Sequence, residues 1–196
     1  MFRVLIAEDE WLVAYTLREQ LEQQKCKVVG IAKTGEQTLE LCRSERPDVV
    51  LVDITMPSTD GIEATRRIMQ ECPTCVIVVT AHGQPHHVLR AEEAGAMAYL
   101  LKPVSGAQIL PAIKLATRRF AEFKSLQEQG ADLQRALETR RLVERAKGIL
   151  MKQADISEAD AFRRLQKMAK QRRLSLREVT EEVITSATAA DEFFSA

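Results

Sequence analysis

The stretch Pro47-Asp-Val-Val-Leu-Val-Asp53-Ile-Thr-Met-Pro57 decides the fold. Its centre, Val49 to Val52, is a short apolar run of mostly β-branched residues, which is typical of a strand buried on both faces inside a parallel sheet. The run ends in Asp53, and Asp60-Gly61 then marks a turn into the next helix. Ligands of open α/β sheets bind at the carboxyl ends of strands, so Asp53 is either a loop cap or a functional carboxylate.

Apolar runs alternate with helical patterns on both sides of this stretch. We expect further strands at 3–7, 27–32, 76–79 and 98–101, and helices at 12–24, 36–45, 60–71 and 86–94, with a last helix from 105 or 106. Five alternating β-α units predict an α/β fold with a parallel, doubly wound sheet, right-handed crossovers and the flavodoxin-like strand order 2-1-3-4-5.

Composition and charge narrow the class of protein. Lys and Arg number 28, as do Asp and Glu, so the net charge of zero hides any local patch. No apolar run approaches the roughly 20 residues of a membrane span, and no signal-peptide pattern precedes the first strand. We therefore expect a cytoplasmic protein with no membrane partner. The pair Cys72-Pro-Thr-Cys75 closes a helix rather than opening one and has no second CxxC, which disfavours a redox or zinc site.

Polar residues stand at the carboxyl ends of four predicted strands. They are Glu8, Asp9, Asp53, Thr80 and Lys102. In this fold those ends share one rim, where three carboxylates require a nearby cation. Oxygen ligands suit Mg²⁺, and phosphoryl transfer needs a nucleophile, a divalent cation and a positive side chain. We interpret Asp53 as the nucleophile, Thr80 as a hydroxyl donor and Lys102 as the balancing charge. A glycosidase-like carboxylate pair is the competing interpretation, but it does not use Thr80 or Lys102.

The same positions carry a resemblance to a known family. Residues 1–120 resemble the receiver domain of two-component response regulators, through Glu8-Asp9, Asp53, Met56-Pro57, Asp60-Gly61, Thr80-Ala81, Gly95-Ala96 and Lys102-Pro103. The resemblance implies that a sensor histidine kinase phosphorylates Asp53. It implies Mg²⁺ held by Asp9, Asp53 and the backbone carbonyl of Thr55, with Glu8 acting through water, and a cis bond before Pro103.

Further switch residues follow from the resemblance. Tyr99 matches the aromatic residue that turns inward when Thr80 moves onto the phosphoryl group, although a half-buried strand tyrosine is the simpler alternative. His82, His86 and His87 are interpreted as loop and helix surface.

The chain after Pro103 is predicted to stay helical to about residue 152. Apolar residues at Ile109, Ile113, Ala116, Phe120 and Phe123 follow coiled-coil spacing. The same spacing resumes, after a stammer of three residues, at Leu126, Gly130, Leu133 and Leu137. This pattern predicts either dimerisation or packing against the receiver of the same chain.

Two more helices are predicted, at 157–171 and 175–187, because Ser157-Glu-Ala-Asp160 and Ser175-Leu-Arg-Glu178 have capping-box patterns. Between 135 and 177, thirteen basic residues against five acidic ones give a net charge of +8. Such an excess on a small three-helix domain is typical of a polyanion-binding protein, or else of a solvated helical face. The predicted domains are a receiver at 1–120, a coiled-coil linker at 121–134, the three-helix domain at 135–188 and a tail at 189–196.

The second half also resembles a known family. Leu137-Glu-Thr-Arg140 and Ala146-Lys-Gly-Ile-Leu-Met151, with Ala161-Phe162 after them, resemble the ANTAR domain of transcription antitermination regulators. The resemblance implies that a dimer binds RNA hairpins in mRNA leaders and that the protein is not an enzyme. We expect phosphate or base contacts from Arg140, Lys147, Phe162, Arg163 and Lys167. A core role for Phe162, a DNA-binding output and a protein-binding output remain alternatives.

Overall fold

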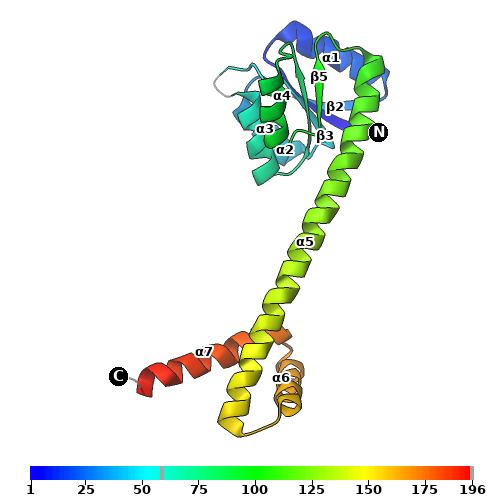
Figure 1. Ribbon diagram of the computed structural model, residues 1–196. Helices are drawn as coiled ribbons and strands as arrows, with labels where there is room; N and C mark the ends of the chain where they lie inside the picture. The colour runs from blue at the N-terminus through cyan, green and yellow to red at the C-terminus, as the bar shows by residue number, and fades with distance from the viewer. Residues whose placement is uncertain (58–59, 195–196) are drawn as a thin grey trace. The chain divides into compact units, whose positions relative to one another are not determined.

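Figure 1 shows a computed structural model of the chain, which describes the backbone of residues 1–57 and 60–194 and the side chains of 1–57 and 60–187. The chain divides into two compact units, Met1–Ser125 and Leu126–Ala196. Each unit is described by itself. Among the described residues, no helix is both long enough and apolar enough to cross a bilayer.

The first unit is a five-stranded sheet with helices on both faces. Its strands are β1 (Arg3–Ala7), β2 (Lys27–Ala32), β3 (Val49–Val52), β4 (Cys75–Thr80) and β5 (Ala98–Leu101). The order is β2-β1-β3-β4-β5, and every neighbouring pair is parallel. The helices between them are α1 (Trp11–Gln23), α2 (Gly35–Glu45), α3 (Gly61–Glu71) and α4 (Pro85–Glu93). The predicted fold class, strand order and alternation are confirmed.

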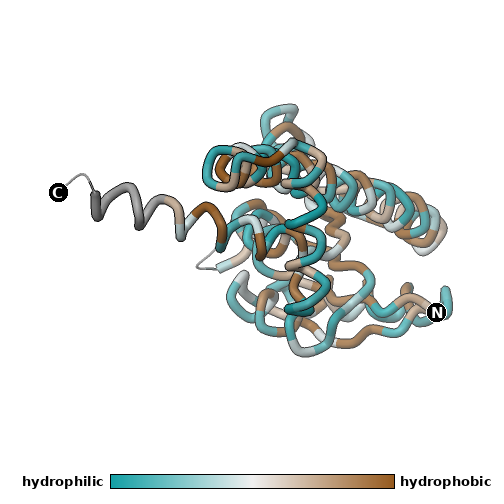
Figure 2. Tube along the Cα trace, turned by 90° about the horizontal axis from the view of Figure 1, so that it is seen from below, coloured by the Kyte–Doolittle hydropathy of each residue, from teal (hydrophilic) through white to brown (hydrophobic). Residues whose placement is uncertain are grey.

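The sheet separates two apolar layers. Leu17 and Leu21 of α1 pack with Ile109 and Ile113 of α5 (Gly106–Ala154) on one face, while α2, α3 and α4 cover the other (Figure 1). All four residues of β3 are at most 1% exposed, as a strand covered on both faces requires. The helices carry both hydrophilic and hydrophobic residues along their length (Figure 2), because each buries only one face.

The predicted coiled-coil seam splits into two parts. Ile109, Ile113 and Ala116 are at most 1% exposed and lie in the receiver core, where Phe120 packs against them. This part of the pattern is therefore explained by packing on the sheet of the same chain, and its interpretation as a seam between chains is wrong. Leu126, Leu133 and Leu137 are instead 67%, 64% and 53% exposed. The three-residue stammer marks the point where the apolar stripe leaves the receiver.

The second unit contains the end of α5 together with α6 (Glu158–Arg172) and α7 (Leu176–Phe194). Ala161, Leu165 and Val179 are fully buried at its centre. The capping box at Ser175 forms in full, since Ser175 N donates to the Glu178 carboxylate over 2.7 Å and Glu178 N donates to Ser175 Oγ over 3.2 Å. At Ser157 only half of the box forms: Asp160 N donates to Ser157 Oγ over 3.2 Å, but the Asp160 carboxylate accepts from the Ser157 hydroxyl. The predicted small three-helix domain is confirmed.

Helix α7 does not end near residue 187 as predicted but continues to Phe194. The segment after Ile184 contains neither Gly nor Pro, so the sequence offers no residue that stops a helix there. Residues 195–196 of the predicted tail lie outside the described residues.

Candidate functional site

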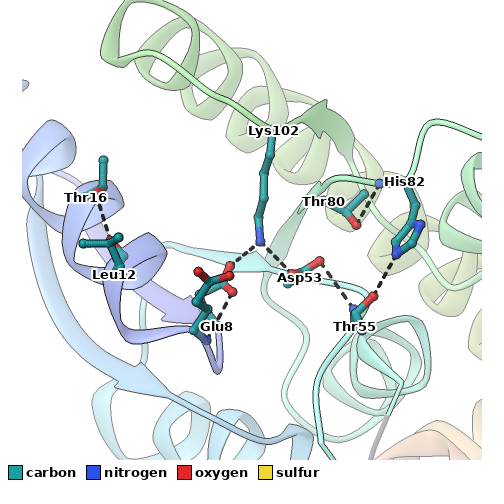
Figure 3. A network of polar contacts seen from close by, with 9 residues as sticks. Glu8, Leu12, Thr16, Asp53, Thr55, Thr80, His82 and Lys102 are labelled. Carbon is teal, nitrogen blue, oxygen red and sulfur yellow. Dashed lines mark hydrogen bonds and ion pairs between the residues drawn. The ribbon is translucent and has the colours of Figure 1, made fainter.

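The carboxyl edge of the receiver sheet brings charged side chains from three strands together. Lys102, which follows β5, places its Nζ 2.5 Å from Glu8 Oε2 and 2.6 Å from Asp53 Oδ2 (Figure 3). Glu8 is only 2% exposed and Asp53 8%. Two buried carboxylates repel each other unless a cation lies close to both, and Lys102 is that cation here.

The electrostatics of this trio follow from its burial. Burial raises the pKa of Glu8 above its usual value, although Lys102 pulls it down. Burial also lowers the pKa of Lys102, but hydrogen bonds to Asp53 and Glu8, with their charges, outweigh that effect and leave it raised. Lys102 therefore stays charged, as a group that neutralises carboxylates must.

Local backbone geometry fixes Asp53 in place. Gly61 N donates to the Ile54 carbonyl over 2.8 Å, which draws the start of α3 against the end of β3. A Cβ at position 61 would lie 1.8 Å from the Asp53 carbonyl oxygen, so only glycine allows this approach. Asp60 caps α3 by accepting from Ile62 N over 2.9 Å. The Asp-Gly pair after β3 thus serves both the helix start and the position of Asp53.

The remaining predicted residues of the rim lie in different settings. Thr80 is fully buried at the end of β4, while the side chain of Thr55 is exposed. Asp9 is exposed and forms no ion pair within residues 1–57 and 60–187. The bond between Lys102 and Pro103 is cis, as predicted. Within the described residues, no group of three or more His, Cys, Asp or Glu side chains is already gathered around one metal position.

His82 is a residue whose place the sequence analysis missed. Its ring Nε2 lies 3.1 Å from Thr55 Oγ1, and its backbone N donates to Thr80 Oγ1 over 3.3 Å. The hydroxyl of Tyr99 donates to the His82 carbonyl. His82 therefore connects the loop after β3, the end of β4 and a residue of β5. Figure 3 shows its contacts with Thr55 and Thr80. Its position two residues after a strand end was the available signal.

The predicted RNA-contacting residues fall into two places in the second unit. Arg140, Lys147 and Phe162 line one groove of about 590 Å³, and Arg163 and Lys167 line another of about 440 Å³ on α6. Lys147 is only 8% exposed, and its Nζ lies 2.8 Å from Glu144 and 2.6 Å from Glu158. The structure thus sets Lys147 in an ion-pair network rather than on the surface.

Most other cations of this unit are not neutralised. Of the thirteen Lys and Arg residues between 135 and 177, five form ion pairs: Arg135, Lys147, Arg163, Arg172 and Arg177. The other eight form none within the described part of the chain. Unpaired positive charges at this density favour contact with a polyanion.

The fold and the acid rim define a response regulator receiver. Residues 4–114 match the family described as response regulator receiver domain, and residues 131–184 match the ANTAR domain. The chain belongs to the response regulators that carry a receiver domain followed by an ANTAR domain.

Relatives agree with that assignment. The transcriptional regulatory protein PdtaR of Mycobacterium tuberculosis is 44% identical over 182 residues, which covers 93% of this chain and 89% of that protein. A protein-glutamate methylesterase/protein-glutamine glutaminase of Syntrophus aciditrophicus is 42% identical, but over 53% of this chain and 31% of that enzyme. The signal receiver domain of the putative response regulator NarL from Mycobacterium tuberculosis superposes with a TM-score of 0.57 at 32% identity, over 60% of this chain and 96% of that one.

Proposed function

We propose that this chain is a phosphorylation-controlled regulator whose C-terminal unit binds RNA hairpins in mRNA leaders and prevents transcription termination. The carrying observation is the set of eight unpaired cations within the stretch that matches the ANTAR domain. The kinship with a transcriptional regulatory protein supports the same output. Hairpin loops expose unpaired bases, which side chains on helices can contact.

Asp53 is the proposed phosphoryl acceptor. One carboxylate oxygen attacks the phosphorus of a phosphohistidine on a sensor kinase, the P–O bond forms, the P–N bond breaks, and the imidazole leaves to take a proton from water. Lys102 lies against Asp53 and balances the added charge. Thr80, at the end of the adjacent strand, offers a hydroxyl to the new phosphoryl oxygens, and Tyr99 is the proposed second switch residue.

The acid rim suits Mg²⁺. The candidate oxygen donors are Glu8, Asp9, Asp53 and the Thr55 carbonyl, three carboxylates against the single ammonium of Lys102. Magnesium keeps several waters and needs only one or two carboxylates, so the exposed Asp9 need not already point at a shared position. When bound, the ion would neutralise phosphoryl oxygens during transfer.

An apolar surface beside this rim is the proposed docking site for the kinase. Trp11, Leu12 and Tyr15 of α1 are 67%, 62% and 44% exposed, with the two aromatic rings stacked 5.3 Å apart. Leu12 also lines a hollow of about 440 Å³ that includes Lys102. Trp11→Ala should slow transfer from a histidine kinase and leave transfer from acetyl phosphate unchanged. Equal slowing with both donors would contradict this docking role.

Dimerisation through the exposed part of α5 is the proposed relay. Leu126, Leu133 and Leu137 follow coiled-coil spacing and project into solvent, which favours pairing with a second copy. Sedimentation with and without acetyl phosphate should show a dimer that Leu133→Asp abolishes. Ala131→Asp, placed off the seam on the same helix, is the matched control. A dimer that survives Leu133→Asp would exclude this seam.

The function itself is tested by RNA binding. Purified full-length protein is titrated with RNA hairpins and with duplex DNA, with and without acetyl phosphate and Mg²⁺, alongside Asp53→Ala. Binding to hairpins that rises on phosphorylation, and does not rise in the variant, is the expected result. A preference for duplex DNA, or no binding to either nucleic acid, would overturn the proposed output.

A further inference from the structure

The groove that contains Arg140 has features that general attraction to phosphate does not require. It lies between α5, α6 and the start of α7, entirely within the second unit, and has a volume of about 590 Å³. Its floor is apolar, formed by the buried Val143 with Phe162 and Leu176. An apolar floor with an aromatic ring, bordered by polar and charged side chains, can hold a flat ligand, whereas a phosphate tract needs only exposed cations.

The rim of the groove is suited to an anionic backbone. Arg140 is exposed and has no ion-pair partner among residues 126–187. Arg135 lies five residues earlier on the same helix and pairs with Asp132 over 2.6 Å, but both side chains are more than two-thirds exposed. Surface ion pairs of this kind contribute little, so Arg135 can exchange Asp132 for a phosphate. Two guanidinium groups therefore flank the apolar floor.

One wall of the groove holds a hydrogen-bond acceptor in a fixed position. Lys147 is buried and bridges Glu144 on α5 and Glu158 on α6, with distances of 2.8 and 2.6 Å. Lys147 Nζ forms an ion pair with Oε1 of Glu144, whose side chain is 58% exposed where it lines the groove. A carboxylate oxygen held there accepts from an N–H or amino group. Lys147 is thus a positioning residue, which orients Glu144 without touching the ligand.

We propose that this groove receives one unpaired base of an RNA loop, stacked on Phe162, with an amino edge on Glu144 and a neighbouring phosphate on Arg140. This inference rests on the proposed RNA-binding function and names the subsite where the base is read. Aromatic rings stack with every base, so selection comes from the edge. Adenine, cytosine and guanine carry an exocyclic amino group, whereas uracil has only its ring N3–H to donate, so we expect bases that turn an amino group toward Glu144 to bind more tightly than uracil.

The test uses full-length protein and a library of RNA hairpins with one fixed stem and a randomised loop, under the conditions that favour binding. In the tightest hairpin, each loop nucleotide is replaced in turn by an abasic residue and by uridine. We expect one position at which the abasic change weakens binding about tenfold to a hundredfold, the range for loss of one stacked base. At that position, uridine should weaken binding as well.

Three variants assign that position to the groove. Phe162→Ala should remove the effect of the abasic change, since the stacking partner is already absent. Ala136→Trp fills the groove from an exposed site and should do the same without altering the core, which covers the case in which Phe162→Ala does not fold. Glu144→Gln should keep the affinity for the abasic hairpin and change the preference among the four bases.

Arg164→Ala is the matched control, because Arg164 lines the other hollow on α6. It should weaken all hairpins equally, abasic ones included, as loss of a phosphate contact does. If the abasic change still weakens hairpin binding in Phe162→Ala and in Ala136→Trp, the proposed base subsite is wrong, although the chain still binds RNA. If no member of the library binds the wild-type chain, the proposed function itself fails.

Discussion

The receiver site and the cationic surface of the C-terminal unit are built differently. In the receiver, Asp53 and Lys102 come from different strand ends, are joined at 2.6 Å and are largely withdrawn from water. In the C-terminal unit, Arg140 and Lys167 lie exposed on helices without ion-pair partners among the described residues. A reaction requires fixed geometry in a low dielectric, whereas polyanion binding requires cations that can move toward phosphate. The first region should therefore be intolerant of single changes, and the second should lose function gradually.

The largest effect is expected at the fixed site. Asp53→Asn keeps the shape of the side chain and removes its nucleophilic charge, so phosphoryl incorporation from acetyl phosphate should be abolished. Incorporation is measured by gel shift of the phosphorylated form. Asp48→Asn is the matched control, since Asp48 stands at the other end of the same strand and accepts from Arg3 N over 2.7 Å. Full incorporation in Asp53→Asn would mean that another residue is the acceptor.

The two units should also differ in how they unfold. Leu165 is fully buried in the small C-terminal core, and Leu165→Ala should reduce the free energy of unfolding of that unit by about 3 kcal/mol. The chain has one tryptophan, Trp11, so its fluorescence reports the receiver, while circular dichroism reports helices in both units. In Leu165→Ala, the urea concentration at which helix is lost should be lower than in the wild type, while the midpoint of the fluorescence transition should stay unchanged. A joint shift of both signals would show that the units unfold together.

Acid should weaken the C-terminal unit through its caps and ion pairs. Hydrogen bonds from Ser175 lower the pKa of Glu178, the hydrogen bond from Lys147 lowers that of Glu158, and Ser157 and Arg163 lower that of Asp160. A carboxyl whose folded pKa is lowered adds stability above its unfolded pKa, and that stability is lost as the pH falls through the folded value. The urea midpoint of helix loss should therefore fall as the pH drops below about 4. In Glu178→Gln, the urea midpoint should fall less steeply with decreasing pH. The same pH dependence as in the wild type would exclude the Glu178 cap as a cause.

The sequence predicted the receiver more fully than the C-terminal unit, for a physical reason. The last residues of parallel strands lie at one edge of the sheet, so the strand pattern alone predicts that Glu8, Asp53 and Lys102 lie close together. Helical periodicity shows that a face is apolar but not what covers it, which is why the stripe at Ile113 fitted a second chain as well as the receiver of the same chain.

The same limit applies to single side chains whose role depends on their partners. Nothing in the order of residues indicated that Lys147 is held between Glu144 and Glu158, because Glu158 lies on the next helix. His82 likewise has a role only through Thr55, in the loop after β3, and Tyr99, in β5. Its carbonyl and its ring are engaged by contacts from different parts of the chain, and such convergence exists only after folding.

The smallest effect should distinguish free from paired cations on α6. Lys167 is unpaired among the described residues, whereas Arg163 pairs with Asp160 over 2.7 Å. If Lys167 contacts a phosphate, Lys167→Ala should weaken all hairpins alike and reduce the slope of log K against log salt by about one. Arg163→Ala should change the slope less, because Asp160 already neutralises part of the charge of Arg163.

Asp160→Asn provides the reverse test, since it releases Arg163 and should strengthen RNA binding at low salt. Equal effects of the two alanine variants would mean that RNA displaces Asp160, and the cations of this helix would then act as one set whatever their partners in the free protein.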